Sequence, residues 1–423
     1  MRIRTAIFAT ALSLSASAQL PNVQLPQVQL PPVQLPGGGL PETTRALGGT
    51  VRELTGARAL RAERLLNEHR ATLDRDPRGD LVVRAEVVAI DITADALAGA
   101  QKAQFVVLRS QELADLGVKI TVLQTPQGMS ASRGLKRLRK LDPDGTYDYN
   151  HVYLDSGEVG TAAIAEGGDE PGHSFRGTGR VGLIDGGVDE KHEAFARIRI
   201  HHNGCDGKAV PSPHGTAVAY LMVSRNSIGE IFAADVYCGE AFGGAVDAVS
   251  SAFGWMARER VAVINVSLVG PRNKLMERVV KALVARGHVI VAAVGNDGPA
   301  APPLFPASYD GVIGVTAVDT KHRVLMEACR GKQVDFAALG ADINAAAGAP
   351  DVYVPVRGTS FAAPIIARLF ASELESPDPA RAQNAIAKWS GIANDLGKPG
   401  RDDVYGEGEL GEFRDPSLGS RYK

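Results

Sequence analysis

The apolar run VGLIDGG at residues 181–187 is the segment from which the architecture of this 423-residue chain can be predicted. A continuous apolar run that ends in Asp-Gly is typical of a strand buried on both faces of a parallel sheet. Four similar runs and four helical patterns follow, at residues 232–238, 261–267, 288–294 and 311–317 and at residues 216–224, 246–259, 273–286 and 361–374. The alternation predicts an α/β fold, with a mainly parallel sheet flanked by helices and a site at the carboxyl ends of its strands.

Three side chains with catalytic potential stand beside glycine at predicted ends of these elements. Asp185 ends the first strand, His214 precedes an apolar helix in PHGT, and Ser360 opens another helix in GTSFAAP. A serine hydroxyl becomes a nucleophile when an imidazole accepts its proton, and a carboxylate holds that imidazole in the required tautomer. The order Asp, His, Ser is one of the chain orders known for this triad, and it predicts a serine hydrolase.

A fourth polar residue, Asn296, follows the apolar run 288–294 in the sequence VGND. This position places its amide at the same edge of the sheet as Asp185. Acyl transfer builds an oxyanion, and an amide N–H can donate to it together with the backbone N–H of Ser360. Taken singly, such residues are also common in turns, loops and helix N-caps, so it is their combination that indicates catalysis.

These motifs together resemble those of the subtilisin-like serine peptidase family. The similarity extends over residues 177–411 and rests on LIDGG, HGTAVA, AVGN and GTSFAAP. It implies a subtilisin-like fold in which Ser360 is the nucleophile and His214 the general base and then the acid. The same resemblance implies that Asp185 orients the histidine and that Asn296 donates to the oxyanion.

The resemblance also implies two segments that bind the substrate. Ser267, Leu268 and Val269 correspond to a strand that pairs with the substrate backbone, and they face Ala293 and Gly295 across the pocket for the residue before the cut. Many members of the family have glycine at the position of Val269. Because a β-branched side chain narrows that entrance, we expect small or slender residues before the cut to be preferred over Phe and Tyr.

Residues 42–155 precede the predicted catalytic domain, residues 156–423. An amphipathic helix over residues 50–73 is followed by a predicted β-α-β-β-α-β order, with strands at 81–90, 105–108, 118–123 and 147–154 and helices at 93–102 and 132–141. This order is that of a small α+β, ferredoxin-like fold. The family resemblance implies a prodomain that assists folding and occupies the active site until the enzyme cuts it, between about residues 151 and 173. A permanent accessory domain is the alternative.

The amino terminus is typical of an exported protein. In residues 1–18, two arginines precede a short apolar stretch and the small-residue sequence ASA, as in a signal peptide. Residues 19–41 repeat Leu-Pro every five positions, which predicts an extended, polyproline-like linker. The apolar stretch is too short to span a membrane. We therefore expect a secreted or periplasmic protein without a membrane span.

Three cysteines in an exported protein indicate one disulfide and one spare thiol. Cys205 and Cys238 flank the predicted helix after His214 and are the expected pair, which leaves Cys329 free. A metal site is a weaker interpretation. His201 and His202 lie near Cys205, but adjacent strand residues point to opposite faces and do not readily share one ion.

Cofactors and partners are only partly determined by the sequence. The segment NSIG at residues 226–229 resembles part of a calcium-binding loop of the family. This resemblance leaves undecided whether a structural calcium ion binds there. The predicted chemistry itself requires no cofactor. A net charge of −2 lacks the excess of positive charge that is typical of nucleic-acid-binding proteins.

The predicted function is therefore that of an exported, self-processing serine endopeptidase. It would act on protein or peptide substrates, and on its own prodomain, through an Asp185, His214 and Ser360 triad and an acyl-enzyme. A non-catalytic binding or regulatory protein with the same fold is the alternative.

Overall fold

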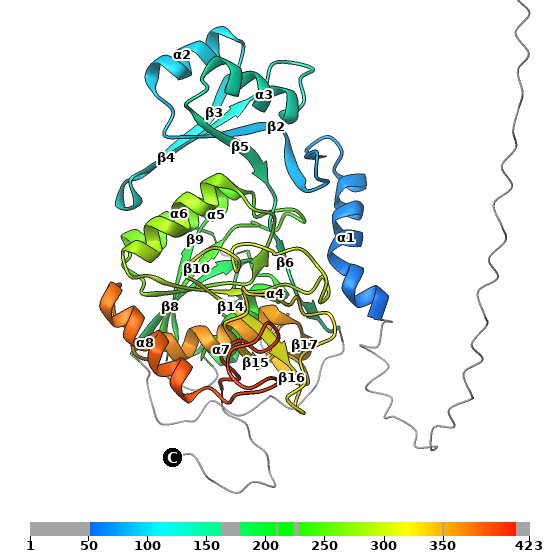
Figure 1. Ribbon diagram of the computed structural model, residues 1–423, viewed down its shortest axis with the longest axis vertical. Coiled ribbons are helices and arrows are strands. Elements are labelled where there is room, and N and C mark those ends of the chain that lie inside the picture. Colours follow the sequence, from blue (N-terminus) through cyan, green and yellow to red (C-terminus); the bar gives the residue numbers. More distant parts are fainter. Residues whose placement is uncertain (1–50, 162–177, 209, 224–227, 349–350, 412–423) are drawn as a thin grey trace, which may run out of the picture. The chain divides into compact units, whose positions relative to one another are not determined.

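The computed structural model describes residues 51–161, 178–208, 210–223, 228–348 and 351–411 (Figure 1). The predicted signal peptide, the Leu-Pro linker and the first half of the calcium-like segment, residues 226–227, lie outside the described residues. The described residues belong to one compact unit, Leu47–Lys423. None of its described helices combines the length and apolar character that crossing a membrane requires.

A seven-stranded sheet lies at the centre of the predicted catalytic domain, in the order β15-β14-β13-β11-β8-β10-β9. All neighbouring strands in it are parallel. The strands are β8 Gly179–Asp185, β9 Arg199–Asn203, β10 Ile228–Asp235, β11 Val263–Val266, β13 Val289–Ala293, β14 Val312–Val318 and β15 Phe336–Leu339. This sheet confirms the predicted α/β class. The sequence patterns missed the two outermost strands because β9, RIHHN, is largely polar and β15, FAAL, is short.

Helices cover both faces of this sheet. They are α4 Pro213–Val223, α5 Val246–Arg258, α6 Lys274–Ala285, α7 Thr359–Ala371 and α8 Pro379–Ile392. Successive strand residues enter opposite cores: Val263 packs in the core of α4, α7 and α8, whereas Ile264 packs in the core of α5 and α6. This two-sided burial explains why the strands read as continuous apolar runs. Helix α8 was not predicted from the sequence.

The amino-terminal region forms a smaller α+β part of this unit, with a sheet of its own. Its elements are α1 Val51–Glu68, β1 Leu73–Arg75, β2 Leu81–Ile90, α2 Ala94–Lys102, β3 Val106–Leu113, a 3₁₀ turn at Ala114–Leu116, β4 Val118–Gln124, α3 Ala131–Leu141 and β5 Thr146–His151. The sheet is antiparallel, with β5, β2, β4 and β3 side by side and β1 beside the start of β2. Helices α2 and α3 cover one face through Ala100, Leu135 and Leu138.

The other face of this small sheet packs on α5 and α6, which Figure 1 shows directly below it. Val88, Ile120 and Val122 share a core with those two helices. Two polar side chains of β5 meet helix amino termini, because Asp148 Oδ2 accepts from Lys274 N at 2.8 Å and Asn150 Oδ1 accepts from Asp247 N at 3.4 Å. A carboxylate at a helix amino terminus is favourable, so these contacts fix the small domain on the large one.

The predicted strand over residues 147–154 is wrong in one respect, because the structure divides it. Strand β5 ends at His151, where the chain leaves the small sheet, and the next strand pairs in a different sheet. The remaining elements are β6 Leu154–Asp155, β7 Glu158–Val159, β12 Leu268–Val269, β16 Ile343–Ala346, β17 Tyr353–Arg357 and 3₁₀ turns at Glu193–Phe195 and Cys205–Gly207.

Candidate active site

Asp185 and His214 form a buried hydrogen-bonded pair at the carboxyl edge of the large sheet. Asp185 ends β8, and the two oxygens of its carboxylate lie 2.9 and 3.1 Å from His214 Nδ1. The histidine is the second residue of α4, not the residue before that helix, because Pro213 occupies the first helical position. Close packing requires glycine next to it, since a Cβ on Gly215 would lie 2.2 Å from the carbonyl oxygen of Gly186.

The environment of His214 suits a group that exchanges a proton. Burial by itself lowers the pKa of His214, but the charge and the hydrogen bond of Asp185 outweigh this effect, so the pKa is raised above its usual 6.5. The Asp185 contact also fixes Nδ1 as the protonated nitrogen of the neutral ring. Within the described part of the chain, the buried Nε2 atom has no hydrogen-bond partner. It is therefore the nitrogen that can accept a proton.

Ser360 is the second residue of α7 and is fully buried. Its Oγ lies 2.8 Å from Ser156 Oγ and donates to the carbonyl of Ser267 at 3.1 Å, so it is engaged with these groups and not with His214. The turn before the helix depends on Gly358, which has a φ of 134°. A Cβ there would lie 2.8 Å from Asn296 Nδ2.

Asn296 brings its amide to the same point from the end of β13. Its Oδ1 accepts from the backbone N–H of Thr359 at 3.1 Å, which turns Nδ2 toward the segment in front of the serine. There Nδ2 donates to the carbonyl oxygen of Ser156. The carbonyl of Ser156 thus lies against Asn296, while the side chain of Ser156 contacts Ser360.

The chain around Ser156 crosses this site in an extended conformation. Strand β6 pairs antiparallel with β12, with Leu268 opposite Asp155 and Val269 opposite Leu154. Strand β7 pairs antiparallel with β17 on the far side of the peptide bond between Ser156 and Gly157. Addition of a strand to exposed edges is a common way to bind an extended peptide.

The predicted substrate-binding residues are only partly brought together. Leu268 and Val269 pair with strand β6 of the crossing segment. Ser267 lies beside the serine, because its Oγ donates to the carbonyl of Ser360 at 2.9 Å. Ala293 is buried at the end of β13. Gly295 bonds instead to its neighbours, because its N–H donates to Thr359 Oγ1 at 3.2 Å and its carbonyl accepts from Cys329 N at 2.9 Å.

Several residues of this site carried no recognisable signal in the sequence. Tyr153 is fully buried, its hydroxyl donates to the carbonyl of Pro271 at 2.8 Å, and its N–H donates to the carbonyl of Gly244 at 2.9 Å. Arginines of α1 also reach the site: Arg61 pairs with Asp155, and Arg58 Nε lies 2.6 Å from Asp297 Oδ2. Charged positions on a helix are ordinarily solvated, so nothing local to α1 indicated these contacts.

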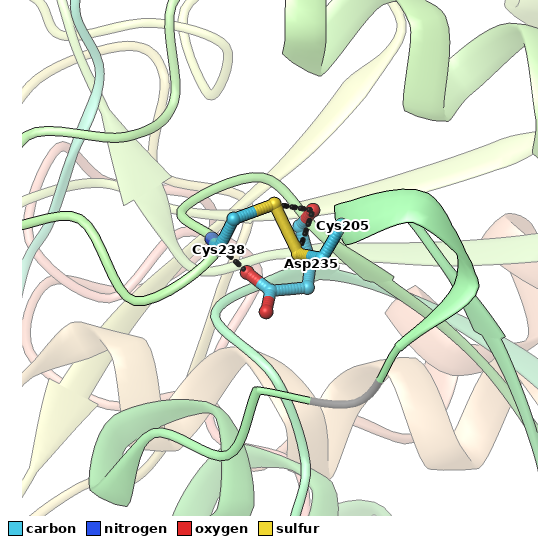
Figure 2. A group of neighbouring side chains, drawn as sticks. All are labelled: Cys205, Asp235 and Cys238. Carbon is cyan, nitrogen blue, oxygen red and sulfur yellow. Dashed lines mark hydrogen bonds between the residues drawn. A yellow bond between two sulfur atoms is a disulfide. The ribbon is translucent and has the colours of Figure 1, made fainter.

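The structure joins Cys205 and Cys238 in a disulfide, the pair that the sequence suggested, and Cys329 is a buried free thiol. Figure 2 shows Asp235 beside the bridge, with Oδ1 accepting from Cys238 N at 2.9 Å. These three residues are close enough to surround an ion, but the two sulfurs are bonded to each other and are not thiolate ligands. Burial raises the pKa of Cys329 to about 12, which disfavours the thiolate form that reacts as a nucleophile.

The two adjacent histidines do not form a metal site with Cys205. His201 Nε2 lies 3.2 Å from Glu230 and His202 Nε2 lies 3.0 Å from Glu190, so the two side chains reach different partners. This divergence is the one expected for neighbouring residues of a strand, here β9.

Comparison with known proteins gives a consistent result. The model of the Subtilase family matches residues 178–408, more than half of the chain. Minor extracellular protease Epr of Bacillus subtilis is 30% identical over 220 residues, which cover 49% of this chain and 34% of that protein. Subtilisin DY of Bacillus licheniformis is 28% identical over 243 residues, covering 54% of this chain and 87% of that protein. The chain thus spans about a third of the length of Epr and most of subtilisin DY.

Among solved structures, the chain is similar to the crystal structure of fervidolysin from Fervidobacterium pennivorans, a keratinolytic enzyme related to subtilisin. The TM-score is 0.64 at 17% identity, and the match covers 79% of this chain and 62% of that one. At this level of identity the likeness shows a shared fold.

Proposed function

Because this chain belongs to the subtilase family, we propose that it is a serine endopeptidase that hydrolyses peptide bonds through an acyl-enzyme. One observation carries the proposal: the carbonyl of Ser156 accepts a hydrogen bond from Asn296 while Ser360 Oγ lies 2.8 Å from the hydroxyl of the same residue. An extended peptide is therefore held with its carbonyl against an amide donor and beside a serine. This is the arrangement that acyl transfer requires.

In the proposed mechanism, Ser360 Oγ attacks the carbonyl carbon and His214 Nε2 accepts the proton of the hydroxyl. Asp185 holds Nδ1–H of the ring and stabilises the imidazolium that forms. Asn296 Nδ2 and the backbone N–H of Ser360 donate to the oxyanion. Loss of one such donor in subtilisin lowers turnover about 10²- to 10³-fold, and we borrow this magnitude for Asn296. His214 then protonates the leaving amine, and water releases the acyl group by the reverse sequence.

The proposal includes self-processing of an exported precursor. The prodomain, predicted over residues 42–155, would extend to Ser156, because the bond between Ser156 and Gly157 is the one that lies against Ser360 and Asn296. This bond falls within the range predicted from the sequence. Export is supported by the signal-like residues 1–18 and by the disulfide, because such bonds persist in oxidising compartments.

Labelling with a fluorophosphonate tests the proposed chemistry. After processing and removal of the prodomain, the wild type should form a covalent adduct at Ser360, and Ser360→Ala should form none. The labelling rate should rise with pH and reach half of its maximum above pH 6.5, because His214 must lose its proton to act as a base and its pKa is raised. His214→Ala is the control for that pH dependence. A wild type that neither processes itself, nor labels, nor cleaves peptides would instead indicate a non-catalytic member of the family.

A further inference from the structure

Helix α3 presents a row of four basic side chains to the solvent. Its sequence, ASRGLKRLRKL, contains five basic residues and no acidic residue. Four of the five, Arg133, Lys136, Arg137 and Lys140, follow the spacing i, i+3, i+4 and i+7, which places them on one side of the helix. All four are exposed, and we call them the basic stripe.

The large domain does not cover the basic stripe. On its other side, α3 packs against the small sheet through Leu135 and Leu138. The far face of that sheet packs on α5 and α6 of the large domain. Figure 1 shows this order of layers, with α3 on the side of the small sheet away from α5 and α6. The stripe is therefore accessible while the bond between Ser156 and Gly157 lies in the active site.

The side chains of the stripe are not neutralised by the rest of the described chain. Among the described residues, none of the four has an ion-pair partner. The arginines of α1 differ in this respect, because Arg58 pairs with Asp297 and Arg61 pairs with Asp155. Like charges three or four residues apart repel each other and destabilise a helix. An anionic surface in front of the stripe would offset this repulsion.

The excess of positive charge is local to α3. Residues 51–156 carry 16 basic and 15 acidic residues, a net charge of +1, whereas residues 157–423 carry 27 basic and 32 acidic residues, a net charge of −5. A negatively charged surface would therefore attract the stripe and repel the large domain. Attachment of the uncut chain to such a surface thus depends on α3.

An anionic bilayer fits the stripe better than a soluble polyanion such as nucleic acid. Leu141 is 49% exposed and ends α3 four residues after Arg137, on the same side of the helix. A leucine beside basic residues suits the boundary between lipid head groups and acyl chains. The sequence of α3 contains no aromatic residue on which a base could stack. Clusters of about four to eight basic residues on an amphipathic helix are typical of anionic-lipid binding.

We propose that the basic stripe of α3 binds the anionic phospholipid surface of a membrane. Its guanidinium and ammonium groups contact the lipid phosphates, and Leu141 reaches the boundary of the acyl chains. The large domain, on the other side of the small sheet, faces away from this surface. Resting on the proposed function, cleavage after Ser156 ends the attachment of residues 157–423 once the two parts separate, because those residues lack the stripe.

Sedimentation with vesicles tests the proposal on the full Ser360→Ala chain, which needs no self-processing. We expect vesicles of equal parts phosphatidylglycerol and phosphatidylcholine to bind this chain, and vesicles of phosphatidylcholine alone not to bind it. Lys136→Gln combined with Lys140→Gln should weaken binding about thirtyfold, at about fivefold for each cation near the surface. Glutamine has a helix propensity close to that of lysine, so α3 remains folded.

The matched control is Lys321→Gln combined with Lys332→Gln, which removes two exposed lysines of the large domain and should leave binding unchanged. All of these proteins keep residues 1–50, so a difference between them reports the exchanged side chains. Added salt should weaken the binding of the parent chain, because screening reduces the attraction. Equal sedimentation with both kinds of vesicle, or equal binding by the stripe variant and the control, would overturn the inference. Binding to heparin but not to the anionic vesicles would assign the stripe to a soluble polyanion instead.

The wild type separates this inference from the proposed function. Its processed large fragment should stay in the supernatant of the anionic vesicles, and recovery of that fragment with the vesicles would contradict the role of α3. A wild type that stays intact would contradict the proposed self-processing but not the binding measured with Ser360→Ala.

Discussion

The chain is held differently on the two sides of the bond between Ser156 and Gly157. On the amino side, β6 pairs with β12, Tyr153 is fully buried and Asp155 is paired with Arg61, so side chains hold the segment in addition to the backbone. On the carboxyl side, Glu158 is exposed and the segment is held mainly by backbone pairing of β7 with β17. Under the proposed self-cleavage, this difference favours retention of the amino side and departure of the carboxyl side. After a cut we expect residues up to Ser156 to remain bound as an inhibitor.

The largest expected effect is that of Tyr153→Ala, which weakens the binding of the amino side. Truncation of a buried aromatic side chain costs about 3–5 kcal/mol, so the prodomain should bind the processed enzyme about a hundredfold to a few thousandfold more weakly. The measurement is the peptidase activity that appears when the purified complex of both fragments is diluted. Tyr153→Phe is the matched control, because it keeps the ring and loses the hydroxyl, whose hydrogen bond to Pro271 is worth about 1 kcal/mol. Equal inhibition in Tyr153→Ala and wild type would show that this side chain is not the anchor.

A second test concerns Val269, which lies in β12, the strand that pairs with the amino side. The residue is buried in β12 and lies opposite Leu154, the third residue before the bond. We expect the wild type to cleave after Ala or Leu faster than after Phe, and Val269→Gly to reduce this difference. One or two methyl groups in a pocket are worth about 1–3 kcal/mol, which corresponds to a discrimination of about ten- to a few hundredfold. Equal or faster cleavage after Phe by the wild type would show that Val269 does not guard the pocket.

The carboxyl side is tested by Gly157→Val. A Cβ at this position would lie 2.6 Å from Cε2 of Phe361, so a branched side chain forces the segment away from the serine. Overpacking of this kind costs about 1–3 kcal/mol, and self-processing should slow by about five- to a hundredfold. The conversion of precursor to product over time measures the rate. Glu158→Ala is the control, because it changes an exposed neighbour and should process itself at the wild-type rate. Self-processing of Gly157→Val at the same rate as this control would contradict the steric explanation.

The sequence predicted the features that are local in the chain. Asp185, His214, Asn296 and Ser360 could be found because each stands at the end of an apolar run, where a regular element brings it to one edge of the sheet. The inner strands were found because burial on both faces makes them continuously apolar. The mainly polar β9 was missed because it lacks that pattern.

The remaining features depend on contacts between distant parts of the chain. Arg58 and Asp297 are 239 residues apart, and although Asp297 stands in the VGND motif, nothing local in either segment indicates that the two side chains pair. Likewise, the division after His151 reflects the pairing of β5 with β2 and of β6 with β12 in two different sheets, which no local pattern indicated. The role of Tyr153 was hidden for the same reason, since its pocket is formed by the large domain.

The most direct test of the account is the amino-terminal sequence and intact mass of the purified protein, compared between wild type and Ser360→Ala. The account predicts that the wild type yields a fragment beginning at Gly157, together with its cleaved prodomain. Ser360→Ala should fold and remain joined through the bond between Ser156 and Gly157. Conversion of Ser360→Ala to the same fragment without added protease, or a wild type that stays intact at this bond, would contradict the account.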